Sequence, residues 1–125
     1  MYTTEIEALE AKVLAKTISD DDFIDTIVKA ITDSPGAPAL LHDISLQLYD
    51  RDTRTSPINT YPEPELHAAI LALNTECLSR GDKRTTAYLT LLARLMEHED
   101  KYDLLIRWTL SRLVGIAIAK EIKDV

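Results

Sequence analysis

The chain is poor in the residues that mark several structural classes. Among its 125 residues there are one cysteine, three glycines and five prolines, and aromatic residues make up 6%. A single cysteine, Cys77, excludes an intramolecular disulfide framework and is typical of a reducing compartment. The scarcity of glycine and proline argues against an all-β protein, which would need many tight turns. Because aromatic side chains are few, we expect aliphatic residues to fill the core.

Signals for targeting and membrane insertion are also missing. The first five residues, Met1 to Glu5, are polar and acidic, and no basic segment followed by an apolar run predicts a signal peptide. The most apolar stretch, residues 104–119, is interrupted by Arg107 and Arg112 and is shorter than the ~20 residues that span a bilayer. We therefore predict a soluble, cytoplasmic protein with no membrane partner.

Positive charge is scarce and unevenly placed. The net charge is −7, and residues 1–36 hold eight acids against three lysines, whereas residues 81–125 hold seven acids and eight bases. An acidic chain is a poor general ligand for nucleic acid, because phosphate contacts need a positive field. Hydrophobic residues at 46% and charged residues at 28% are ordinary for a globular domain, and 125 residues are enough for one core.

Apolar residues recur every three or four positions along most of the chain, which predicts amphipathic helices. Capping residues mark several helix ends, with Ser19 and Asp82 as N-caps and Gly81 just after a helix. The expected helices span residues 4–17, 19–32, 38–49, 64–80, 82–98 and 101–123. Residues 50–63 have no period and form an irregular loop. The sequence thus predicts the all-α class, as one compact bundle of about six helices over residues 1–125.

The last expected helix differs from the others because its apolar residues point in nearly every direction. A helix that is apolar all round is either central to the core or covered by a partner. Ser111, Gly115 and Ala119 recur at four-residue spacing and form a small-residue strip that another helix could approach closely. With Trp108, they are our candidates for close helix packing or an oligomer interface. Glycine inside a helix costs about 1 kcal/mol relative to alanine, so we expect a packing reason for Gly115.

No motif places a catalytic group or a metal ligand at a specific spacing. The serines lack a nucleophile elbow, the glycines form no phosphate-binding loop, and Cys77 falls on an apolar helix face as a core filler. The acids and histidine at 97–100 are consecutive, and neighbours on a helix point about 100° apart, so they cannot converge on one ion. We predict no catalytic residue, no metal and no cofactor. An enzyme with a histidine–carboxylate site, using His67, His98 or His42, is the second alternative.

Three bases cluster at the expected turn between the fourth and fifth helices: Arg80, Lys83 and Arg84. Cations at a helix N-terminus oppose the helix dipole, and such local conflicts sometimes serve function. The first alternative is therefore a helical subunit of a nucleic-acid-associated complex that uses residues 80–84. The acidic total makes nucleic acid the less favoured partner.

Our leading prediction is a small acidic protein-binding module, of the regulator, inhibitor, immunity or adaptor kind. Its partner would be another protein, and a homo-oligomer through the C-terminal helix is a further option. One candidate surface is the acidic patch at Asp20, Asp21, Asp22 and Asp25, which a basic partner could recognise. Helix capping alone accounts for three of these acids. The second candidate surface lies in the loop, at residues Arg51, Arg54 and Tyr61.

Overall fold

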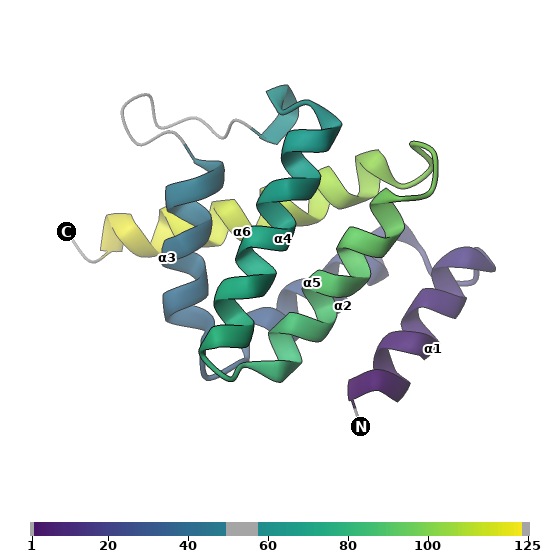
Figure 1. Cartoon of the computed structure of the whole chain (residues 1–125), viewed down its shortest axis with the longest axis horizontal. Helices are drawn as coiled ribbons and strands as arrows, with labels where there is room; N and C mark the ends of the chain where they lie inside the picture. Colours follow the sequence, from purple (N-terminus) through teal and green to yellow (C-terminus); the bar gives the residue numbers. More distant parts are fainter. Residues whose placement is uncertain (1, 50–57, 124–125) are drawn as a thin grey trace.

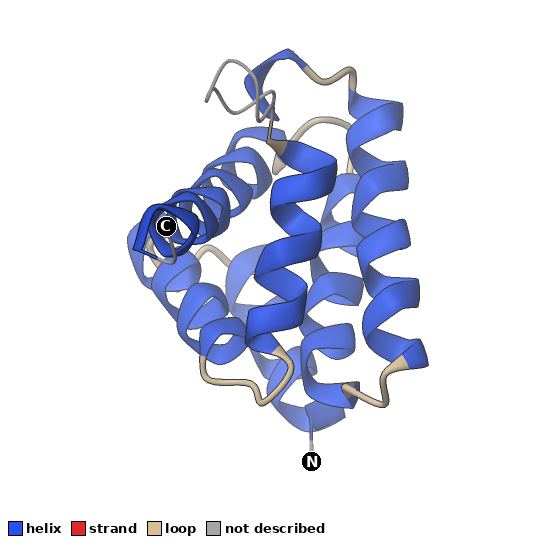
Figure 2. Ribbon diagram, turned by 90° about the vertical axis from the view of Figure 1, so that its left-hand side faces the viewer, coloured by secondary structure: helices blue, strands red, loops and turns tan. Residues whose placement is uncertain are grey.

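The computed structural model describes residues 2–49 and 58–123, the side chains of residues 2, 3 and 121–123 aside. Within these residues all regular structure is helical and no strand occurs (Figure 1, Figure 2). The elements are α1 (Tyr2–Leu14), α2 (Asp20–Thr32), α3 (Ala37–Leu48), the short 3-10 helix η1 (Ile58–Thr60), α4 (Glu63–Ser79), α5 (Lys83–Met96) and α6 (Asp103–Lys123). The predicted all-α bundle of six helices is confirmed.

Helices that are far apart in the sequence pack against one another, as do helices that follow each other. The α4–α5 pair forms the most extensive helix contact, and the two helices run side by side in Figure 1. The last helix, α6, packs against α2, α3, α5 and η1, and α1 packs against α5. Because α5 contacts α1, α2, α4 and α6, and α6 contacts α2, α3, α5 and η1, these two helices tie the bundle together.

The core is aliphatic, as the composition predicts. Phe23 is the one aromatic residue among the largest fully buried side chains of the described chain. The others come from α2 to α5 and η1: Ile27, Ile31, Leu40, Ile44, Leu48, Ile58, Leu66, Ile70, Leu73, Leu89 and Leu91. Burying such a side chain stabilises the fold by about 1.5–3 kcal/mol relative to leaving it in water.

The first helix ends earlier than its periodicity predicts. It stops at Leu14 rather than at residue 17, because Lys16 takes a left-handed conformation with φ 58°. The N–H of Thr17 then donates to the carbonyl of Lys12 at 2.9 Å, and the N–H of Lys16 donates to that of Val13 at 3.1 Å. These two bonds form a Schellman cap, a role that usually falls to glycine.

The turn between α4 and α5 follows the predicted caps. Gly81 has φ 77°, and the N–H of Asp82 reaches the carbonyl of Cys77 at 2.9 Å. The Asp82 carboxylate caps α5 by accepting the N–H of Thr85 at 3.0 Å. It also accepts the hydroxyl of Ser34 at 2.8 Å, from the link between α2 and α3. Asp82 therefore holds two junctions of the bundle together.

Close packing between Asp82 and the link from α2 to α3 explains why a glycine occupies position 36. A Cβ atom added to Gly36 would lie 2.6 Å from Oδ2 of Asp82, so a larger residue there would displace the Asp82 carboxylate from its hydrogen bonds. Burial opposes ionisation of Asp82, but the hydrogen bonds from Thr85 and Ser34 outweigh it and lower the pKa of that carboxyl.

The described end of the predicted loop is fastened to the bundle through Arg107. Its guanidinium pairs with Asp103 at 2.9 Å and donates to the carbonyl oxygens of Ile58 and Tyr61. The hydroxyl of Tyr61 donates to the carbonyl of Gln47 at the end of α3. The loop residues from 58 onwards are thus held between α3 and α6. Two predicted partner-binding residues of the loop, Arg51 and Arg54, lie outside the described residues.

Candidate protein-binding face

The C-terminal helix has one buried face and one open face. Its buried residues pack into the bundle: Leu105, Ile106, Thr109, Leu110, Leu113, Val114 and Ala117. On the other side Leu104 is 56% exposed and Trp108 is 46% exposed. Figure 2 looks almost along α6, which lies at the left-hand edge of the bundle and ends at the letter C. The helix is therefore a core element on one side, while its other side carries large apolar groups in solvent.

We call this open side the outer face of α6, and six residues define it: Leu104, Trp108, Ser111, Arg112, Gly115 and Ala119. At about 100° per residue they fall within one arc of roughly 100°, so they form a single stripe along the helix. A Cβ atom added to Gly115 would meet nothing within 4 Å. The packing reason that we expect for this glycine is therefore not found inside the described chain.

A hollow of about 420 Å³ opens beside the first turns of the outer face. The end of α1, the start of α2 and the start of α6 form its walls. Its lining is mostly apolar and includes three charged side chains, Lys16, Asp20 and Lys101. The other lining residues are Val13, Ile18, Ser19, Phe23, Tyr102, Leu104, Leu105 and Trp108. An apolar concavity with a few charges at its edge is the usual form of a binding site.

The predicted acidic patch lies beside this hollow. Asp20, Asp21, Asp22 and Asp25 are all exposed on α2, and Asp20 lines the hollow itself. The hydroxyl of Ser19 accepts the N–H of Asp22 at 3.1 Å, so the predicted N-cap is present. Asp25 forms an ion pair of 2.8 Å with Arg112 of the outer face. The structure therefore brings two surfaces that the sequence presents separately into one region.

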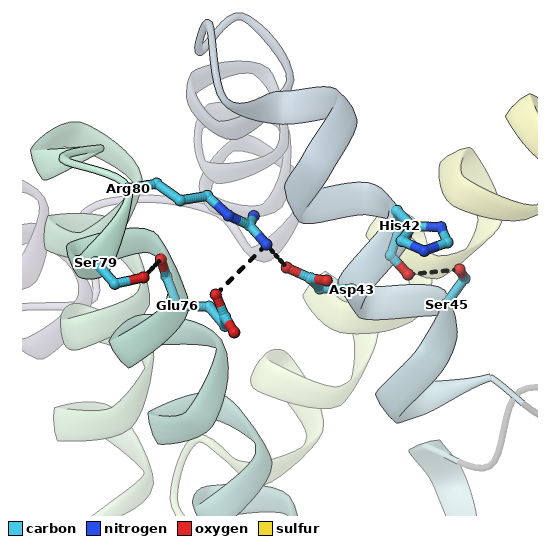
Figure 3. Close-up of polar contacts among 6 residues, drawn as sticks. All are labelled: His42, Asp43, Ser45, Glu76, Ser79 and Arg80. Carbon is cyan, nitrogen blue, oxygen red and sulfur yellow. Dashed lines mark hydrogen bonds and ion pairs between the residues drawn. The ribbon is translucent and has the colours of Figure 1, made fainter.

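The predicted basic turn offers less cationic surface than the sequence indicates. Arg80 pairs with Asp43 of α3 at 2.5 Å and with Glu76 at 3.5 Å, as Figure 3 shows. Arg84 is partly buried, and Lys83 is exposed. A hollow of about 560 Å³ lies at the turn, and Asp82 lines it together with the three bases. Arg80 is therefore engaged within the chain, and nucleic-acid contact at this turn stays a prediction.

The histidines are not assembled into a catalytic group within the described residues. Nε2 of His67 is buried without a hydrogen-bond partner among these residues and lies 3.9 Å from Oε1 of Glu97, which is beyond hydrogen-bond distance. Both residues line a hollow of about 360 Å³. His98 packs edge-on against Tyr102, with ring centres 5.7 Å apart. Figure 3 shows the His42 ring turned away from Asp43. An enzyme stays an alternative without a placed nucleophile.

One carboxyl pair stands out beside His67. A hydrogen bond with Asp100 raises the pKa of Glu63, with smaller contributions from desolvation and from the charge of Asp103. Across residues 2–49 and 58–123, no group of three or more histidine, cysteine or acidic side chains is arranged to hold a metal ion. In the same residues, no helix has the length and apolar character to cross a bilayer.

Comparison with known proteins adds no family: the chain matches no protein-family model, no curated protein and no solved structure. The candidate site therefore stands on its own residues. Sequence reasoning had not named Leu104, Lys101 or Tyr102 as site residues. The available signal was Leu104 itself, an apolar residue one turn before Trp108 on the same side of a helix.

Proposed function

We propose that this chain is a protein-binding module that works by interaction rather than by catalysis, with the outer face of α6 and the adjoining hollow as its binding face. The observation that carries the proposal is the exposure of Trp108 and Leu104 at the edge of an apolar hollow. Trp residues in such positions dominate the binding energy of protein interfaces. Covering apolar area is favourable by about 25 cal/mol per Å², so a partner chain gains from seating here.

The surroundings of the face favour a protein partner. Charged groups of both signs stand around the apolar centre, with Lys16, Lys101 and Asp20 at the hollow and the Asp25–Arg112 pair beside the stripe. An apolar centre with a polar rim is the usual anatomy of a protein interface. A regulator or adaptor in the cytoplasm is the form of the proposal that best suits an acidic chain with one buried, unpaired cysteine.

Site-specific photo-cross-linking tests the proposal without knowledge of the partner. A benzophenone amino acid replaces Leu104 in one variant and Leu46 in a control variant, and both are expressed in the source cell. The control is matched because Leu46 is 54% exposed on α3 and Leu104 is 56% exposed on α6. We expect a discrete protein adduct on irradiation of the position 104 variant and none from position 46. The absence of any adduct at position 104 would overturn the proposed function.

A further inference from the structure

Large and small residues of the outer face of α6 are placed symmetrically about a midpoint of the helix. Leu104 and Ala119 lie equally far on either side of the midpoint between Ser111 and Arg112, and so do Trp108 and Gly115. In each pair a large side chain on the N-terminal half corresponds to a small one on the C-terminal half. All of these positions lie on the one stripe that the fold leaves partly or fully exposed.

Such a stripe is complementary to itself. If a second α6 lies antiparallel on the first, a two-fold axis at the midpoint sets Trp108 opposite Gly115 of the second copy and Leu104 opposite Ala119. A two-fold interface is built from one patch used twice, so each knob and each hole occurs twice. Resting on the proposed function, we propose that the partner of this face is a second copy of the same chain, paired through antiparallel α6 helices.

The arrangement supplies the missing reason for Gly115. A glycine inside a helix costs about 1 kcal/mol relative to alanine, and a Cβ atom at position 115 would meet nothing of its own described fold within 4 Å. Opposite Trp108 of a second copy, the absent side chain leaves room for an indole ring. Small residues at such a crossing also let two helix backbones approach closely.

The charges along α6 do not oppose this pairing even though the chain is acidic. Residues 104–120 contain no aspartate or glutamate, and two of their three cations, Arg107 and Arg112, are paired with Asp103 and Asp25 of their own chain. Arg112 lies next to the axis and holds Asp25 at 2.8 Å, so two residues of each sign gather there. At the far end, Lys101 comes to lie beside the C-terminal turn of the second α6. Cations are favourable at that end of a helix dipole.

The extent of the outer face can be set against the area that a stable dimer buries. Standard interfaces bury about 800 Å² on each partner, roughly a tenth of a small protein's surface. The accessible surface of this chain is 7098 Å². The outer face runs along α6, a helix of 21 residues and about 30 Å in length, and the walls of the hollow on α1 and α2 widen it at one end.

Sedimentation equilibrium of the purified full chain tests the inference. We expect the wild type to reach twice its monomer mass of 14.0 kDa at high concentration. Gly115→Leu fills the space opposite Trp108, so it should weaken the dimer at least about tenfold, in the range of a hot-spot substitution. Ala72→Leu makes a similar change at an exposed position of α4 and should leave the dimer intact. A wild-type chain that stays at 14.0 kDa at every concentration overturns the inference.

Exchanging the charges of Arg112 and Asp25 gives a second test that does not depend on the steric effect of Gly115→Leu. Arg112→Glu puts acids on both copies beside the axis, so the dimer should weaken by about tenfold or less and more strongly at low salt. Adding Asp25→Arg restores one residue of each sign and should recover the dimer. If the double variant is no better than Arg112→Glu, the placement of the axis is wrong.

The cross-linking experiment separates this inference from the function on which it rests. An adduct at position 104 with twice the chain mass supports both proposals. An adduct that contains a different protein supports the protein-binding function and overturns the second copy as partner. No adduct at all overturns the function.

Discussion

The turn at residues 80–84 and the outer face of α6 make a useful pair, because both attract attention in the sequence and the fold treats them in opposite ways. The turn concentrates charge, and much of that charge is used within the chain: Arg80 binds Asp43, and Asp82 caps α5 and binds Ser34. The outer face concentrates apolar area, and Trp108 and Leu104 remain half exposed. The charges of the turn serve the fold, whereas the exposure of Trp108 and Leu104 beside the hollow is the observation on which the proposed binding face rests.

The largest effect on the stability of the fold should come from the turn. Asp82→Ala removes the N-cap of α5 and leaves Ser34 without its acceptor, so we expect a loss of about 1–2 kcal/mol in the free energy of unfolding. Asp21→Ala, at an exposed acid on α2, should change it by less than about 0.5 kcal/mol. Urea denaturation followed by circular dichroism measures both. Equal losses in the two variants would show that Asp82 is no more structural than a surface acid.

The same variant has a pH signature. The pKa of Asp82 is lowered in the folded chain, so its ionised form stabilises the fold above the ordinary value of 3.8. This contribution is lost as the pH falls through the lowered pKa. The difference in unfolding free energy between wild type and Asp82→Ala should therefore shrink below pH 3.8. A difference that stays constant down to full protonation would contradict the assignment of the cap to the carboxylate.

The next effect has the opposite sign and belongs to the outer face. Gly115→Ala adds a methyl group to α6, and this group would meet nothing within 4 Å in the described part of its own chain. We expect the monomer to gain about 1 kcal/mol in stability, because alanine is the better helix former. Thermal unfolding at a dilution where the chain is monomeric is the measurement. A loss of stability there would mean that Gly115 is needed for packing inside the fold.

The smallest predicted effect compares two cations of the turn. Arg80→Met breaks a pair with Asp43, whose side chain is only 16% exposed, and should cost about 0.5–1 kcal/mol after solvent screening. Lys83→Met changes an exposed side chain and should cost almost nothing. The cost of Arg80→Met should fall in 1 M salt, because screening weakens ion pairs. Equal losses of stability for the two variants would show that the ion pair of Arg80 with Asp43 contributes nothing to the fold.

The features that local chemistry determines could be predicted from the sequence. Ser19, Gly81 and Asp82 act at helix ends through groups within three to five residues, so their capping roles were visible. The end of α1 was missed because Lys16 carries the left-handed turn without the glycine that usually signals it. The partner of Arg80 was not visible either, because Asp43 is 37 residues away.

The two-sided character of α6 lay beyond the sequence for a related reason. Periodicity shows which residues share a side of a helix, but not which sides other helices cover. Leu104 and Leu105 are equally apolar and adjacent, yet one is 56% exposed and the other 8%. Only the packing of α2, α3 and α5 around α6 makes that distinction. The convergence of Asp25 with Arg112 depends on the same packing.

The emission of Trp108, the only tryptophan of the chain, tests the central claim most directly. If the outer face of α6 is covered by a second copy, dilution of the purified protein should shift the emission to longer wavelength and increase its quenching by acrylamide. Gly115→Leu should keep the spectrum of the dilute wild type up to a concentration at least about tenfold higher. An emission maximum that does not depend on concentration, and that matches this variant throughout, would contradict the account.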